Sequence, residues 1–353
     1  MANKCQVSIH GSKIPAPART ARFTNALFLV VLSCLLSLSQ AEGKGPYDRQ
    51  VIHYPYRQGD LTVIGRPRSY TVGPEDTFLD IARKYELGFS EMAILYPRID
   101  PWMPPAGKTI TIPSLFVLPQ IRRGEIVINI PEMRLYFFEK SASRVQTYPV
   151  SIGRTGWETP TGRFFISEKR KHPTWYVPAS LQEKYGTAVM PPGPENPLGE
   201  YIMRFSDSGY SMHGTHMPWG VGRLVSHGCI RCYPEHMRLL YPQVPLKTPV
   251  ALIYEPIKFG RKNGRVFVEV HPDVYDRIPD FRKYAAKKLA VCPVKGRIDP
   301  VKFAEAVRLR NGMPVDVTVS ATHIRTDDGS TAPDACRSVD KLVRRKSNSV
   351  NPP

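Results

Sequence analysis

Short apolar segments follow one another closely through the middle of the chain. Residues 125–130 and 134–138 are almost wholly apolar on either side of a Pro-Glu turn, and residues 145–152 and 163–167 continue the series. Runs of β-branched and aromatic residues of this length, separated by glycine and proline, are typical of strands. Several such strands in succession predict a mainly β domain, built as a sandwich or as a distorted barrel of mixed strands.

The same pattern continues towards the C-terminus. Residues 201–205 and 209–213 predict two more strands, residues 234–240 a short helix, and residues 249–254 a closing strand. Before these strands, residues 177–197 are rich in proline and have no periodic pattern. A connection of that length without regular structure is usually functional or disordered, so we interpret it as a flap beside a binding site.

A smaller unit precedes the β domain. Residues 68–72 alternate between polar and apolar positions like a strand, and apolar residues then recur at helical spacing over 78–85 and again over 90–96. A second strand at 109–113 closes the unit. The order strand, helix, helix, strand predicts a small α+β domain at residues 68–114.

The first 41 residues have the pattern of an export signal. They contain four basic residues and no acidic one, an apolar run at 26–36, and a polar ending that closes on Ala41. This arrangement describes a secretory signal peptide with cleavage after Ala41, whereas a retained membrane anchor would need about 20 apolar residues. We therefore expect a signal peptide at 1–41, export of the protein, and no transmembrane segment after cleavage.

Three further segments complete the predicted organisation. Residues 42–67 hold several glycines and prolines and predict an irregular linker, and residues 324–353 are polar and predict a disordered tail. Between the β domain and this tail, residues 257–323 form a basic region. Within it, the spacing of apolar residues indicates one strand and two helices, at 264–271, 281–289 and 300–309.

The chain is strongly basic, with a formal net charge of +18. The 49 basic residues less the four of the signal peptide, against 31 acidic residues, leave a charge of +14. Such a protein could bind nucleic acid, anionic lipid or an anionic cell-wall polymer. Export argues against nucleic acid, and the sequence has no zinc-finger, RNA-recognition or helix-turn-helix pattern. We therefore expect the polyanionic cell envelope as the partner.

The residues best suited to catalysis lie around Cys229. This cysteine follows a Ser-His-Gly sequence and precedes Ile-Arg, and His213 stands a loop's length upstream, at the end of a strand-like stretch. A thiol becomes an effective nucleophile when a base lies beside it. Small neighbours such as Gly228 leave backbone N–H groups free to face an oxyanion. Cys229 and His213 are therefore candidates for thiol-based acyl transfer.

Two other interpretations use the same residues. Cys229 and Cys232 form a Cys-x-x-Cys pair, which suggests a redox function. The sequence around this pair lacks the alternation of strands and helices in which thioredoxin-like motifs occur. As a second alternative, His213, His227, Cys229 and Cys232 offer the ligand chemistry of a zinc site.

The stretch from His213 to Arg231 as a whole resembles the signature of the L,D-transpeptidases, the YkuD-type cysteine enzymes that cross-link bacterial peptidoglycan. The resemblance extends over about residues 121–256. The unit at 68–114 resembles a LysM module, although Tyr96 stands where that module usually has asparagine. A LysM module implies binding to glycan that contains N-acetylglucosamine, and the alternative is a packing domain without a ligand. The arrangement is similar to periplasmic enzymes of Gram-negative bacteria.

The resemblance implies a role for each residue of the motif. Cys229 would be the nucleophile and His213 the general base. Arg231 would lie near the donor's carboxylate or clamp the loop, and His227 would orient its neighbours or act as a second base. The remaining candidate positions for substrate binding or for the oxyanion are Ser226, Gly228 and Gly214.

The reaction implied by the resemblance is transpeptidation. The enzyme would cleave a tetrapeptide stem between the L-centre of its third residue and a terminal D-alanine, forming a thioester. The thioester would pass to an amine of another stem peptide or of a lipoprotein lysine. Water as the acceptor would make the protein a carboxypeptidase-type hydrolase, and a cell-wall binding protein without catalysis is the third alternative. The resemblance implies no cofactor and no metal.

Overall fold

The computed structural model describes residues 51–120, 123–206 and 208–320. The predicted signal peptide at 1–41 and the predicted tail at 324–353 lie outside the described residues. Within the described residues, no helix combines the length and the apolar character needed to cross a membrane.

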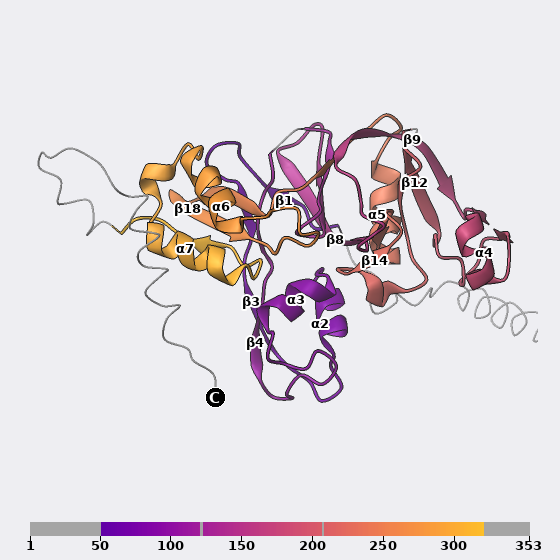
Figure 1. Ribbon diagram of the computed structural model, residues 1–353, viewed down its shortest axis with the longest axis horizontal. Helices are drawn as coiled ribbons and strands as arrows, with labels where there is room; N and C mark the ends of the chain where they lie inside the picture. Colours follow the sequence, from indigo (N-terminus) through magenta and orange to yellow (C-terminus); the bar gives the residue numbers. More distant parts are fainter. Residues whose placement is uncertain (1–50, 121–122, 207, 321–353) are drawn as a thin grey trace, which may run out of the picture. The chain divides into compact units, whose positions relative to one another are not determined.

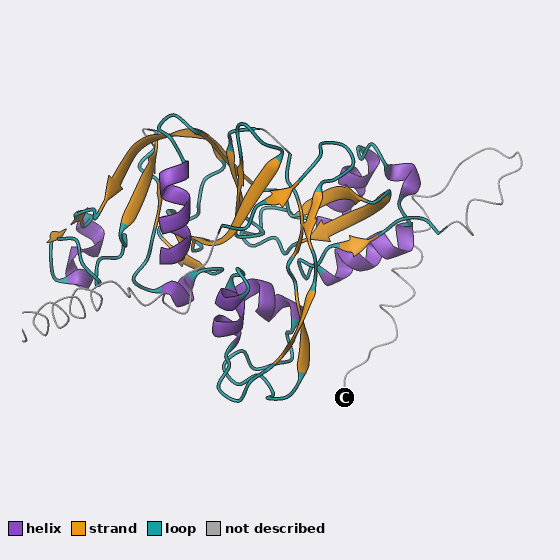
Figure 2. Ribbon diagram, turned by 180° about the vertical axis from the view of Figure 1, so that it is seen from behind, coloured by secondary structure: helices purple, strands orange, loops and turns teal. Residues whose placement is uncertain are grey.

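Most of the strands belong to one mixed sheet that closes on itself (Figures 1 and 2). Its closed path is formed by β6 (Ile126–Asn129), β7 (Arg134–Phe138), β8 (Arg144–Gly153), β9 (Gly162–Lys171), β12 (Tyr201–Phe205), β13 (Ser211–His213), β15 (Ile230–Cys232) and β16 (Pro249–Ile253). The strands follow the order β8-β15-β13-β12-β9-β16-β6-β7, and β7 pairs back onto β8. The pairs β13–β15 and β6–β16 are parallel, and the other pairs along the path are antiparallel. The prediction of a mainly β domain with a barrel of mixed strands is confirmed.

Alternate residues of the barrel strands fill one apolar core. Val150, Met212 and Ile230, from three neighbouring strands, are fully buried in it. The helix α5 (Pro234–Leu240), at the position where the sequence predicts one, adds Met237 and Leu240 to the same cluster. Because side chains alternate along a strand, the residues between these core positions lie on the opposite face of the sheet, where they can form a site.

The unit before the barrel has the predicted order of strand, helix, helix and strand. Its elements are β3 (Arg68–Thr71), α2 (Phe78–Lys84), α3 (Phe89–Leu95) and β4 (Thr109–Ile112). Phe78 and Met92 of the two helices are fully buried in a cluster that also contains Tyr136 and Phe138 of β7. The unit and the barrel therefore share one apolar core. We call the unit the N-terminal module.

The stretch predicted as an irregular linker differs from that prediction in its described part, residues 51–67. It contains β1 (Tyr54–Pro55), which pairs with β8, and β2 (Val63–Gly65), which pairs with β5 (Leu115–Val117). Val63 and Ile64 are buried. The partner strands lie 50 to 90 residues further along the chain, and the burial of these apolar side chains outweighs the local glycine and proline signals.

The basic C-terminal region forms a small sheet with two helices. Its elements are β17 (Ile257–Lys262), β18 (Arg265–Val270), α6 (Phe281–Ala290), α7 (Pro300–Leu309) and β19 (Val315–Asp316). The sheet order is β17-β18-β19, and the region has an apolar cluster of its own. The predicted strand and the two predicted helices are confirmed.

A buried ionic network joins this region to the barrel. Nζ of Lys258 on β17 lies 2.7 Å from Glu132 Oε2 and 3.0 Å from Glu269 Oε1, and it donates to the carbonyl oxygen of Val117 at 2.6 Å. His271 Nε2 lies 2.6 Å from Glu269 Oε1. Glu132, Glu269 and His271 could by their spacing hold a metal ion, but the ammonium group of Lys258 already supplies a cation to both carboxylates.

Candidate active site

Two parallel strands place the candidate residues on one face of the barrel sheet. Met212 of β13 pairs with Ile230 of β15, and His213 pairs with Arg231. Met212 and Ile230 point into the core. Because neighbouring residues of a strand point in opposite directions, His213 and Arg231 share the face that is turned away from that core.

Cys229 lies on the same face, one residue before β15. It precedes Arg231 by two positions, and its Sγ is 3.5 Å from the hydroxyl of Ser211, which precedes His213 by two positions on β13. The thiol is partly exposed, whereas His213 is buried. The structure therefore brings Cys229, His213 and Arg231 together, and it adds Ser211, a residue that the sequence did not single out.

A tight turn holds the backbone before the cysteine. Ser226 Oγ accepts from the N–H of Gly228 at 3.1 Å and donates to the carbonyl oxygen of Cys229 at 2.6 Å. Thr159 Oγ1 donates to the carbonyl oxygen of Gly228 at 3.0 Å. Ser226 therefore fixes the turn, and the N–H of Gly228 is already engaged within it.

Gly228 is required by the shape of this turn. Its φ is +101°, a backbone conformation that residues with a side chain rarely adopt. A Cβ at this position would lie 2.5 Å from Cε1 of Tyr210. The glycine thus lets the backbone pass close to the Tyr210 ring just before the nucleophile candidate.

His213 is held as a neutral imidazole. Its Nδ1 lies 2.7 Å from the carbonyl oxygen of Gly214. Burial lowers the pKa of His213, and the positive charge of Arg231 lowers it further, to about 3, against the opposing effect of the Gly214 and Pro197 carbonyls. Gly214 thus orients the imidazole through its carbonyl group.

Arg231 has unused hydrogen-bonding capacity. Its Nε is buried without a hydrogen-bond partner among the described residues, and the same holds for the hydroxyl of Ser151, which pairs with Arg231 across β8 and β15. Burial lowers the pKa of Arg231, while Tyr185 and Cys229 raise it. An anionic group of a ligand could satisfy both donors.

His227 lies at the rim of the site. Its ring meets that of Trp157 edge-on, with 4.9 Å between the centroids, and its Nε2 is 3.5 Å from an Nη of Arg154. Burial lowers the pKa of His227, followed by the charges of Arg154, Arg231 and Lys184. These contacts favour the expected orienting role of His227 over that of a second base.

Cys232 belongs to the core and not to the site. It is buried in the same apolar cluster as Ile230, and burial raises the pKa of its thiol to about 12. Cys229 and Cys232 are both free thiols. Because Cys232 lies on the face opposite to Cys229, the structure supports neither a redox pair nor a zinc site that uses both cysteines.

The flap predicted beside the site contains regular structure, which corrects the expectation of an irregular connection. Residues 177–197 contain α4 (Ala179–Tyr185) and β11 (Val189–Met190), and β11 pairs with β10 (Trp175–Tyr176), which comes directly before them. The Asn196 side chain closes its base by donating to the carbonyl oxygens of Pro173 and Pro191, at 2.9 and 3.0 Å. Lys184 lowers the pKa of His227 and Tyr185 raises that of Arg231, so the end of α4 lies near these two residues.

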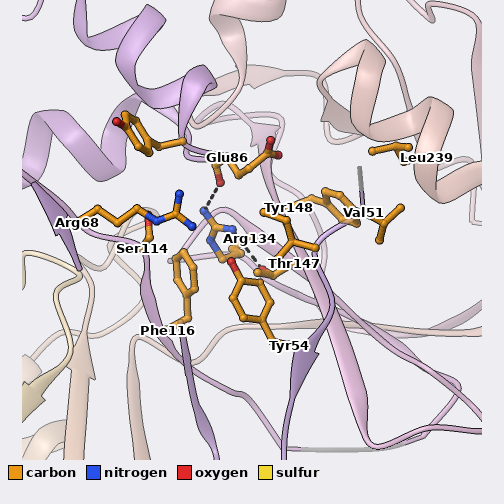
Figure 3. Close-up of a pocket in the computed structure, with 12 residues that line it drawn as sticks. Val51, Tyr54, Arg68, Glu86, Ser114, Phe116, Arg134, Thr147, Tyr148 and Leu239 are labelled. Carbon is orange, nitrogen blue, oxygen red and sulfur yellow. Dashed lines mark hydrogen bonds between the residues drawn. The ribbon is translucent and has the colours of Figure 1, made fainter. Parts of the chain in front are cut away.

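A cavity with about 540 Å³ of empty space, part of it open to solvent, lies elsewhere, where the N-terminal module meets the barrel (Figure 3). The buried guanidinium of Arg134 lines it and donates to the carbonyl oxygen of Glu86 at 3.0 Å. It also donates to the carboxylate of Glu91 at 2.8 Å. Both acceptors belong to the module. These contacts join the module to β7 and make the cavity a structural junction.

Four functional candidates were missed by the sequence, namely Ser211, Ser151, Thr159 and Trp157. Ser211 and Ser151 become visible only through the pairing of their strands, β13 and β8, with β15. Thr159 belongs to a Thr-Pro-Thr-Gly stretch that reads as a turn and carries no sign of its bond to Gly228.

Comparison with known proteins finds similar sequences. The model of the L,D-transpeptidase catalytic domain (YkuD) matches residues 123–252. The chain is 35% identical over 280 residues to "Probable L,D-transpeptidase YcfS" of Escherichia coli, covering 75% of this chain and 88% of that protein. It is 32% identical over 280 residues to "Probable L,D-transpeptidase YbiS" of the same species, covering 75% and 91%. The solved catalytic domain of the E. faecium L,D-transpeptidase matches 38% of this chain and 100% of that domain, at 20% identity and a TM-score of 0.31.

Proposed function

The chain belongs to the L,D-transpeptidases, and on this basis we propose that it transfers an acyl group from a peptidoglycan tetrapeptide stem to an amine. The observation that carries the proposal is the shared face of β13 and β15, where the Cys229 thiol, the neutral imidazole of His213 and the guanidinium of Arg231 lie together. A thiol beside a general base is what nucleophilic cysteine catalysis requires.

In the first step, Cys229 Sγ attacks the carbonyl carbon between the third stem residue and the terminal D-alanine. The thiol proton passes to Nε2 of His213, since Nδ1 keeps its own proton against the carbonyl oxygen of Gly214. Collapse of the tetrahedral intermediate breaks the C–N bond, and the D-alanine amine leaves with the proton from His213. The products are a thioester on Cys229 and free D-alanine.

In the second step, an acceptor amine attacks the thioester carbon and gives a proton to His213 Nε2. The C–S bond breaks, the new amide forms, and the sulfur of Cys229 recovers the proton. The acceptor is the amine of another stem peptide or of a lipoprotein lysine. Water in its place would give hydrolysis by the same groups.

The oxyanion formed in each step requires N–H donors. The N–H of Gly228 donates to Ser226 Oγ and is therefore not available to the oxyanion in this geometry. We assign the oxyanion donor to the N–H of Cys229, with Ser226 and Gly228 shaping the turn that presents it. Removing one such donor typically costs about a hundredfold in rate or more.

For Arg231, the unpartnered Nε supports binding of a substrate carboxylate. A guanidinium whose function was only to clamp the loop would have its buried donors satisfied by backbone carbonyls. The Ser151 hydroxyl beside it is also without a partner among the described residues. The N–H group of Arg231 and the hydroxyl of Ser151 are both suited to a carboxylate of the stem peptide that Cys229 attacks.

The proposed location is the periplasm, and the proposed partner is peptidoglycan. Support comes from the export pattern at residues 1–41 and from the basic charge of the chain. The N-terminal module at 68–114, with its LysM-like order of elements, is proposed to bind glycan.

The test uses the purified protein after removal of its signal peptide. It is incubated with disaccharide-tetrapeptide, with and without a lysine-terminated acceptor peptide, and the products are weighed by mass spectrometry. Cross-linked dimers or peptide adducts with loss of one D-alanine support the proposal and identify the acceptor. Loss of D-alanine with addition of water alone would assign the protein as a hydrolase, and an unchanged substrate would refute an acyl-enzyme function.

A further inference from the structure

Three of the four tryptophans of the chain are exposed to solvent. The exposed fractions are 46% for Trp157, 52% for Trp219 and 54% for Trp102. An isolated exposed apolar residue is ordinary, but these three converge on one segment. All of them belong to, or contact, the 214–228 loop, which connects His213 to Cys229 and includes the short strand β14 (Leu224–Ser226).

The contacts follow this loop along its length. Trp219 lies within it, in the short 3₁₀ segment Pro218–Gly220. The guanidinium of Arg223 stands 3.7 Å from the ring centre of Phe89 and 5.7 Å from that of Trp102, both in the N-terminal module. At the far end of the loop, the ring of Trp157 meets that of His227, two residues before the nucleophile.

Arg223 is held in this loop mainly by its aromatic neighbours. Its Nε is buried and has no hydrogen-bond partner among the described residues. Burial lowers the pKa of this guanidinium. Its contacts in the structure are instead with aromatic rings, because the guanidinium lies over the rings of Phe89 and Trp102.

The loop is fixed from two sides. The N–H groups of Phe89 and Ser90 at the start of α3 donate to the carbonyl oxygens of Val221 and Gly222, at 3.1 and 3.2 Å. The N–H of Gly222 donates to the carbonyl oxygen of Val150 on β8 at 3.2 Å. These hydrogen bonds hold the loop that contains Trp219, which reduces the entropy lost when a ligand binds.

We propose that the 214–228 loop, together with Trp102 and Trp157, binds the glycan strand to which the donor stem is attached. The apolar faces of pyranose rings can stack on the exposed indoles of Trp102, Trp157 and Trp219. The occupant is a β-linked N-acetylhexosamine strand, because the strand is covalently joined to the peptide that must reach Cys229. This inference rests on the proposed function and adds that the enzyme recognises sugar as well as peptide.

The test compares two donors that differ only in the sugar, namely disaccharide-tetrapeptide and the free tetrapeptide. The measured quantity is the ratio of kcat/KM for the two donors. For Trp219→Ala and for Trp102→Ala, the preference for the sugar-bearing donor should fall about tenfold, the effect of losing one ring contact of this kind. Phe165→Ala, which removes an aromatic residue that is 45% exposed on β9, is the matched control and should keep the wild-type ratio.

A binding measurement separates recognition from turnover. With Cys229→Ala, the tetramer of N-acetylglucosamine should change the intrinsic tryptophan fluorescence in a saturable way, and Trp219→Phe should bind it more weakly than the parent while keeping the same melting temperature. Equal use of the two donors by the wild type, with unchanged ratios in both tryptophan variants, would overturn the inference and leave the proposed function intact. The two tryptophan variants could instead keep the wild-type ratio of the donors and lose only transfer to the lysine-terminated peptide. This result would assign the surface to the acceptor and would also overturn the inference. A wild type inactive on both donors would refute the proposed function.

Discussion

His213 and Gly214 are linked by a hydrogen bond of 2.7 Å between the imidazole Nδ1 and the carbonyl oxygen. A carbonyl oxygen can only accept, so Nδ1 carries the proton and Nε2 is left as the acceptor. Burial, followed by the charge of Arg231, lowers the pKa of His213 to about 3. A resting ion pair between imidazolium and thiolate is therefore disfavoured, and proton transfer accompanies the attack by Cys229.

The first prediction concerns the pH dependence of activity. A general base works only when it is unprotonated, so the contribution of His213 is present at neutral pH and is lost as the pH falls through about 3. The profile of kcat/KM should have no limb due to His213 between about pH 5 and pH 7, where an ordinary histidine would titrate. Initial rates with disaccharide-tetrapeptide measure this. An acid limb near pH 6.5 that persists in His227→Gln and in His216→Gln would contradict it.

The second prediction separates the two cysteines of the motif. Cys229→Ala should abolish thioester formation, because it removes the proposed nucleophile. Cys232→Ala should keep activity and lower the free energy of unfolding by about 1 kcal/mol, because it truncates a buried side chain of the core. Intact-mass analysis and denaturant titration measure the two effects.

The same pair predicts the response to mild oxidation. With Cys229 and Cys232 on opposite faces of β15, disulfide-forming oxidants should leave both thiols free in this peptide. Thiol alkylation after oxidation, read by mass spectrometry, checks this outcome. A peptide that contains a Cys229–Cys232 disulfide would show that the turn opens.

The third prediction concerns the contact between the N-terminal module and the 214–228 loop. A Cβ at Gly222 would lie 2.4 Å from the backbone nitrogen of Phe89, and φ at this glycine is +79°. Gly222→Ala should cost about 1–3 kcal/mol of stability and also reduce activity, since the displaced loop leads to Cys229. Gly264→Ala is the control, because Gly264 has a similar φ of +73° but open space around it. If both variants lost the same stability, the effect of Gly222→Ala would come from backbone strain and not from contact with the module.

The fourth prediction concerns the buried ionic network. Lys258→Met leaves the carboxylates of Glu132 and Glu269 buried without their cation, which should cost about 3–5 kcal/mol in the free energy of unfolding. Equilibrium denaturation at neutral pH measures the change. The double variant Lys258→Met with Glu132→Gln should recover part of the loss, because one uncompensated charge is removed. A loss below about 1 kcal/mol in the single variant would mean that water replaces the ammonium group.

Sequence patterns predicted the parts of this fold whose signals are local. Alternation within single strands, the helical spacing of the module and the motif around Cys229 are readable within a few residues. Ser211 was missed because its position beside Cys229 depends on the pairing of β13 with β15, which no local pattern encodes. The strands at 51–67 were missed for a similar reason, since their partners β5 and β8 are distant in sequence.

Cys232 illustrates the same limit. The Cys-x-x-Cys spacing is compatible with a turn that brings both thiols together or with a strand that separates them. Only the register of β15 shows that Cys232 points into the core while Cys229 faces the site. The flap was also misjudged, because its proline content conceals the short helix α4.

The apolar core that Phe78 and Met92 share with Tyr136 and Phe138 affects how these two parts can evolve. Side chains of both parts fill the same space, so a change of volume on one side must be matched on the other. Recombination therefore could not move the module to another enzyme without also changing the side chains of β7 that pack against it. A barrel without the module would expose Tyr136 and Phe138, and it would need polar side chains at these positions of β7.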